Sequence, residues 1–124
     1  MRSIATVVLA LALSTCASPL AMEQRGSPHL QPADEAELQG LLREQAGLEQ
    51  QVEARLRADP TEAPGSEPDC LEICALVRRI CELADRICRI AERHPEALER
   101  CQDSRARCAR ARDRSTGPCA CRPS

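Results

Sequence analysis

The sequence predicts an all-α protein: a small disulfide-stapled antiparallel helical hairpin with a third, acidic N-terminal helix. Cys74, Cys81 and Cys88 recur every seven residues, which places them in one stripe along a helix. The chain of 124 residues has nine cysteines but no Phe, Tyr or Trp. A small core without aromatic side chains is marginal, so we expect cross-links to supply much of the stability.

Residues 1–21 have the pattern of an export signal. Arg2 gives a positive start, Ile4–Leu13 is an apolar run too short to span a membrane, and small residues follow. Leu13-Ser14-Thr15-Cys16 resembles a bacterial lipobox, although Thr15 stands where Gly, Ala or Ser is usual. Two outcomes therefore stay open: lipidation of Cys16, which would anchor the chain to a membrane, or ordinary cleavage just after this segment and secretion.

In both outcomes Cys16 is either removed or lipidated, so eight cysteines remain that can form disulfides. An even number of cysteines in an exported, oxidising setting favours disulfides over free thiols. We therefore predict four disulfides in a protein that is exported, either to the bacterial periplasm as an outer-membrane lipoprotein or as a secreted chain.

A flexible tether is predicted for residues 22–33, because this stretch has little apolar content. An amphipathic acidic helix should follow over residues 34–58, with Asp34 as its N-cap and Glu37 completing a capping box. Its side rich in Glu and Gln is predicted to be solvated. Its apolar side consists of Leu38, Leu41, Leu42, Leu48, Val52 and Leu56.

Residues 59–68 form a Pro-rich linker, since three prolines and a glycine exclude a helix there. The cysteine-rich hairpin is predicted over residues 69–121. Its first helix starts after the N-cap Asp69, with Glu72 three residues later, and ends near His94.

The second helix of the hairpin should start at Pro95, because proline suits the first position of a helix. We expect this helix to run to about Asp113, because Gly117-Pro118 should stop any continuation.

The cysteines can be paired by position, because facing residues of two antiparallel helices have numbers with a nearly constant sum. The sum is the same for Cys88–Cys101, Cys81–Cys108 and Cys70–Cys119, which leaves Cys74–Cys121. The outer two pairs can instead exchange as Cys74–Cys119 and Cys70–Cys121, since the tail is not expected to be helical. Small residues should allow the close approach that disulfides need: Ala97, Ser104, Ala109 and Ala111.

The charges of the two halves predict how the third helix is attached. Residues 22–69 carry 11 acidic residues and 4 arginines, whereas residues 70–124 carry 8 acidic residues and 12 arginines. We expect the acidic helix to pack on the hairpin, with its leucines over Leu76, Leu83 and Ile90. The alternative is that the basic half contacts an external anionic surface.

The overall pattern resembles uncharacterised cysteine-rich exported proteins and lipoproteins of bacteria, and its motif-bearing part covers about residues 70–108. The resemblance rests on the signal, the single acidic helix, the segment ICELADRICRIAERHPE and the helix CQDSRARCARAR. It implies an exported helical protein and supplies no active site.

Metal binding is the alternative function. Thiolates of Cys70, Cys74, Cys119 and Cys121 would suit Cu(I) or Zn(II). The sequence contains no CxxC motif, which closed zinc sites usually carry, and the repeated spacing favours disulfides.

Other chemistry finds little support in the sequence. Cys119 and Cys121 are the only close cysteine pair that could form a labile redox bridge, and the two histidines, His29 and His94, make no catalytic arrangement. Without aromatic residues there is no stacking platform for nucleic acid. We predict a non-enzymatic structural or interaction module of the cell envelope, without a cofactor, whose partner is a protein or another envelope component.

Overall fold

The computed structural model describes residues 30–57 and 68–122, and it is all-α as predicted. The export signal, Cys16, His29, most of the tether and nearly all of the linker lie outside the described residues. Three helices and one short 3-10 turn make up the described part, which has no strand. The elements are α1 (Pro32–Arg57), α2 (Cys70–Arg93), the 3-10 turn η3 (Pro95–Ala97) and α3 (Leu98–Cys119).

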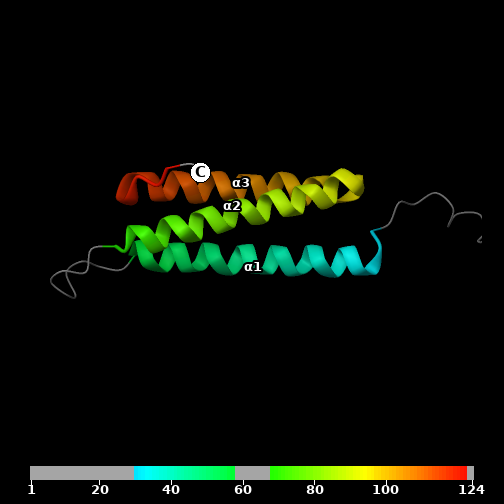
Figure 1. Cartoon of the computed structure of the whole chain (residues 1–124), viewed down its shortest axis with the longest axis horizontal. Helices are drawn as coiled ribbons and strands as arrows, with labels where there is room; N and C mark the ends of the chain where they lie inside the picture. The colour runs from blue at the N-terminus through cyan, green and yellow to red at the C-terminus, as the bar shows by residue number, and fades with distance from the viewer. Residues whose placement is uncertain (1–29, 58–67, 123–124) are drawn as a thin grey trace, which may run out of the picture.

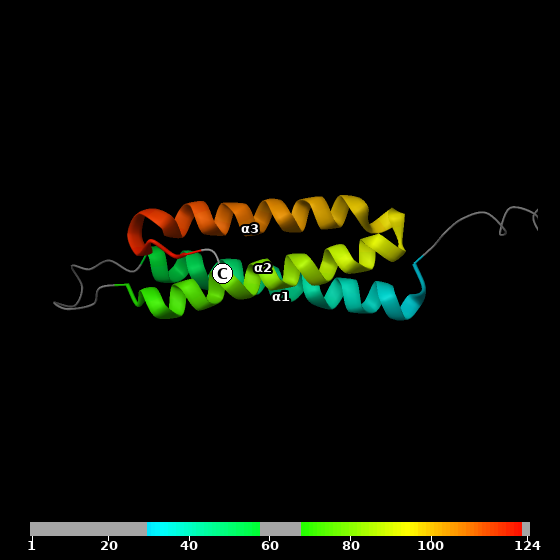
Figure 2. The same cartoon turned by 45° about the horizontal axis from the view of Figure 1, so that its top comes forward.

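The three helices form an elongated bundle in which α2 is antiparallel to both α1 and α3 (Figure 1). The turned view shows the chain after α3 folding back toward α2 (Figure 2). The predicted fold class, a disulfide-linked antiparallel hairpin with a third helix packed on it, is therefore confirmed.

Helix α1 begins two residues earlier than expected. Because the helix starts at Pro32, Asp34 lies in its first turn, and the prediction that Asp34 is the N-cap was wrong. Proline is favourable at the first helical position, where its missing N–H would have had no intrahelical partner. Asp34 and Glu35 then lie near the positive end of the helix dipole.

Helix α2 starts as the sequence predicts. The Asp69 side chain accepts a hydrogen bond from the backbone N–H of Glu72 at 3.2 Å, which satisfies one free donor of the first turn. At the other end the N–H of His94 donates to the carbonyl of Ile90 at 2.9 Å. The turn η3 then leads directly into α3, so the two helices of the hairpin are antiparallel neighbours.

Helix α3 is longer than expected, and the prediction that Gly117-Pro118 stops it was wrong. The helix continues to Cys119 with Pro118 inside its last turn. A proline this close to the end removes only one helical donor, and the disulfide between Cys119 and Cys70 holds the end of α3 against α2. The residue that follows the helix is Ala120, whose φ of 47° is the left-handed conformation common after a helix.

The core is aliphatic and divides into two clusters along the bundle. One cluster brings Leu38 and Leu41 of α1 over Leu83 and Ile90 of α2, which confirms the predicted leucine cover. The other contains Val52 of α1 and several branched residues of α2. Its main members are Val52, Ile73, Val77, Ile80, Cys81 and Cys108.

Candidate functional site

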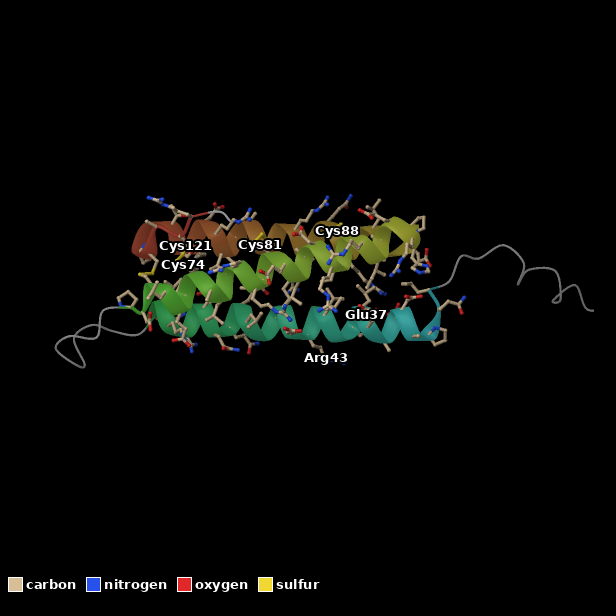
Figure 3. All side chains as sticks on the ribbon, in the orientation of Figure 1. Glu37, Arg43, Cys74, Cys81, Cys88 and Cys121 are labelled. Carbon is tan, nitrogen blue, oxygen red and sulfur yellow. A yellow bond between two sulfur atoms is a disulfide. The ribbon has the colours of Figure 1, made fainter. Side chains whose placement is uncertain are left out.

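Four disulfides join α2 to α3 and to the tail that follows it, and they extend from Cys70 in the first turn of α2 to Cys88 near its end (Figure 3). The structure brings together the three pairs that share a constant sum of residue numbers and the remaining pair, Cys74–Cys121, and it does not adopt the exchanged outer pairing. The bridges and their Cα–Cα distances are Cys70–Cys119 (5.1 Å), Cys74–Cys121 (5.3 Å), Cys81–Cys108 (4.8 Å) and Cys88–Cys101 (4.6 Å).

Small residues of η3 and α3 allow this close approach. Ala97, Ser104 and Ala111 are all buried against the neighbouring helices. Ala109 was expected to contribute as well, but it is exposed, because its position on α3 lies outside the interface with α2. Cα distances of about 4.4–6.8 Å are normal for disulfides, so the backbones need no special distortion to be bridged.

The cysteines of the alternative metal site are all engaged in these bridges. Cys70, Cys74, Cys119 and Cys121 each bond to a sulfur on the facing segment, so none is a thiolate. Cys119 and Cys121, the expected labile pair, are not bonded to each other. Within residues 30–57 and 68–122 no three His, Cys, Asp or Glu side chains form a group that could hold a metal ion.

Helix α1 contains no cysteine, and its attachment to α2 combines apolar packing with ion pairs. Arg79 of α2 pairs with Glu44 at 2.8 Å, and Arg86 pairs with Glu37 at 3.5 Å. Near the two ends of the interface the pairs are Arg93 with Asp34 at 3.8 Å, and Arg55 with Glu72.

A second row of ion pairs attaches α1 to α3. The pairs are Arg100 with Glu35 (2.9 Å), Arg107 with Glu49 (2.8 Å) and Arg114 with Glu53 (2.6 Å). We call the six hairpin arginines of both rows the paired arginines. They recur every seven residues: Arg79, Arg86, Arg93, Arg100, Arg107 and Arg114.

The two rows confirm that the acidic and basic halves of the chain pack together. They also show that the predicted solvated side of α1 was wrong in part, because its glutamates line both interfaces. Exposed ion pairs contribute only about 0–1 kcal/mol each. The apolar stripe therefore provides most of the affinity of α1 for the hairpin, and the ion pairs orient it.

A buried glutamine links all three helices at the middle of the bundle. The side chain of Gln45 is fully buried, and its Nε2 donates to the carbonyls of Ile80 at 3.1 Å and Ser104 at 3.2 Å. Its Oε1 accepts from Ser104 Oγ at 2.8 Å. The predicted apolar side of this helix did not include Gln45, although its position one turn from Leu41 and from Leu48 puts it in the apolar stripe.

His94 lies where α1 meets the turn of the hairpin. Its Nε2 is 3.3 Å from Asp34 Oδ2, and its Nδ1 is 3.9 Å from Glu96 Oε1. His94 therefore connects the start of α1 to the turn of the hairpin. Neither contact places a nucleophile beside the imidazole.

The titration of Glu35 tests the contact between α1 and α3. A hydrogen bond from the Gln39 amide and two from the Arg100 guanidinium lower the pKa of Glu35 below its usual range. The lowered pKa means that the ionised carboxylate favours the folded state, and this contribution is lost as the pH falls through the pKa of the folded protein.

We expect the substitution Arg100→Gln to raise the pKa of Glu35 toward its usual value. Carbon-13 NMR of the side-chain carboxyl groups measures this directly, and Arg43→Gln is the matched control because Arg43 is exposed on α1. An unchanged Glu35 titration in Arg100→Gln would show that the α1–α3 ion pair is absent in solution.

No protein-family model, curated protein or solved structure matches the chain. Among the described helices none is both long enough and apolar enough to cross a membrane.

Proposed function

We propose that the protein is a non-enzymatic, exported structural or interaction module of the cell envelope. The observation that carries this proposal is the set of four disulfides along the hairpin. Disulfides of this number are typical of proteins in oxidising compartments, and the apolar segment near the N-terminus supplies a route out of the cytoplasm.

The described part of the protein is better suited to presenting a surface to a partner than to enclosing a substrate. Five hollows lie on its surface, and arginine side chains line every one of them. The hairpin is cross-linked along its whole length, so its outer face keeps one arrangement of side chains without a large core. Rigid presentation of a surface lowers the entropy lost when a partner binds.

The mass of the intact protein, purified from its native host and alkylated before and after reduction, tests this proposal. We expect the unreduced chain to resist alkylation and to lack two hydrogens for each of the four disulfides. We also expect it in the envelope or the medium, with the export signal removed, and the same spectrum shows whether Cys16 carries a lipid.

Two results would overturn the proposal. Recovery from the cytoplasm with the N-terminal segment intact would exclude export. Eight free thiols with retained copper or zinc would replace the proposal by the alternative, a thiolate metal-binding protein.

A further inference from the structure

Two groups of hairpin arginines differ in their surroundings. The paired arginines face α1 and contact its carboxylates. By contrast Arg78, Arg112 and Arg122 have no carboxylate within salt-bridge distance in the part of the chain that the structure describes. All three line one hollow of about 240 Å³ between the start of α2 and the end of α3, which we call the arginine hollow.

Three separate segments bring these guanidinium groups together. Arg78 lies one turn after Cys74 on α2, and Arg112 lies near the end of α3. Arg122 follows Cys121, and the disulfide of Cys121 to Cys74 returns the tail to α2 (Figure 3). The hollow is therefore assembled by a covalent bond and not only by side-chain packing.

The environment of the hollow favours an anion. Like charges that share one site repel each other, and an anion between them would relieve this repulsion. A fourth arginine, Arg105, lines an adjoining hollow that also includes Arg112. Asp85 is the one carboxylate of that adjoining hollow, and no acidic residue lines the arginine hollow itself among the described residues.

Guanidinium groups match phosphate in geometry as well as in charge. Their planar N–H donors can form two parallel hydrogen bonds to one phosphate group, which a point charge cannot do. The Thr116 side chain also lines the hollow, although its hydroxyl donates to the carbonyl of Arg112 at 2.8 Å and so offers acceptors rather than a donor. The recognition must therefore come from the arginines.

We propose that the arginine hollow is a binding site for a phosphate group, carried either by a phospholipid headgroup or by a small soluble phosphate compound. This binding requires only the oxidised hairpin, so it does not depend on the export proposed above. The paired arginines are less suited to this role, because the carboxylates of α1 already offset their positive charge.

The test uses the full oxidised chain and two probes. Binding of inorganic pyrophosphate is followed by NMR shifts and calorimetry. Binding to vesicles is followed by sedimentation, with phosphatidylcholine containing phosphatidylglycerol compared with phosphatidylcholine alone. We expect saturable binding to one of the two anionic probes, with shifts centred on the backbone amides of Arg78, Arg112 and Arg122.

Variants that each lose one positive charge distinguish binding at the arginine hollow from general electrostatic attraction to the protein. Arg112→Gln and Arg122→Gln should each weaken binding about fivefold. Arg43→Gln changes the net charge equally, but Arg43 lies on the side of α1 away from the hairpin, so its effect should be within about twofold (Figure 3).

A third variant tests the covalent assembly of the hollow. The double substitution Cys74→Ser with Cys121→Ser frees the segment that carries Arg122 without changing the charge, and three disulfides remain to hold the hairpin. We expect weaker binding with unchanged helical content by circular dichroism. If instead this variant binds as the natural chain does, Arg122 has no part in the site.

The outcomes decide both the site and the source of the phosphate. Binding to pyrophosphate identifies a soluble phosphate ligand, and binding to anionic vesicles alone identifies a lipid headgroup. Two results overturn the proposal: no binding to either probe at physiological salt, or an equal loss in Arg43→Gln and Arg112→Gln, which would indicate diffuse electrostatic attraction.

Discussion

Complete reduction of the disulfides is expected to unfold the protein. Each disulfide contributes about 2–4 kcal/mol, whereas the total stability of a native domain is about 5–15 kcal/mol. The largest fully buried apolar side chains are leucines, isoleucines and one valine, and the chain has no aromatic residue to enlarge the core. Without the bridges, the aliphatic contacts must offset the whole loss of chain entropy on folding.

Thermal unfolding by far-ultraviolet circular dichroism, with and without a phosphine reductant, measures this effect. We expect a cooperative transition for the oxidised protein and little helix in the reduced and alkylated protein at physiological temperature. A cooperative transition that survives reduction and alkylation would show that packing alone maintains the bundle.

The overlap of the two outer loops predicts which bridges contribute least to stability. Cys70–Cys119 and Cys74–Cys121 close nearly the same loop, with sequence separations of 49 and 47 residues. With one of them intact, the other restricts the unfolded chain very little further. The double substitution Cys70→Ser with Cys119→Ser should therefore cost less stability than loss of Cys81–Cys108 or of Cys88–Cys101, and it serves as the control for loss of a bridge without loss of the fold.

The hairpin could be predicted from the sequence because the features that specify it are short-range sequence patterns and cysteines that form covalent bonds. Cysteines seven residues apart define one face of a helix, and a short turn at Pro95 fixes which residues oppose each other. The end of α3 could not be predicted in the same way. Gly117-Pro118 is a strong local stop signal, and only the tertiary link of Cys119 to Cys70 explains why the helix continues through it.

The position of α1 was predictable in outline and not in detail. Its leucines and its net charge predict that it covers the hairpin, but not which glutamate meets which arginine. The seven-residue spacing of the paired arginines is visible in the sequence, and only the arrangement of the helices turns it into two rows of ion pairs. The arginine hollow depends on the path of the tail after Cys121, which no local pattern specifies.

Replacing the buried glutamine is the second change expected to have a large effect. Gln45→Leu should lower the free energy of unfolding by about 1–3 kcal/mol, because it leaves the buried Ser104 hydroxyl without its acceptor. Gln45→Ala should cost about 2–4 kcal/mol, since a cavity is added to the lost hydrogen bonds. The matched control is Gln50→Leu, at an exposed position of α1, whose effect should stay within about 0.5 kcal/mol.

A double-mutant cycle shows whether the loss comes from the hydrogen bond or from shape. Replacing both partners of a buried hydrogen bond by apolar groups can be nearly neutral. We therefore expect Gln45→Leu with Ser104→Ala to recover most of the stability that Gln45→Leu loses, as measured by urea unfolding. Additive losses in the double variant would mean that Gln45 and Ser104 do not interact in solution.

Recovered stability need not restore the position of α1 on the hairpin. Gln45 donates to carbonyls of both α2 and α3, and these contacts are satisfied in one register only. Leucines can pack in neighbouring registers at similar energy, and a single buried polar residue is a known way to select one of them. We expect the apolar double variant to be stable but to give broadened NMR signals along α1, with the hairpin signals unchanged. Sharp α1 signals at their original positions would assign the register to the ion pairs instead.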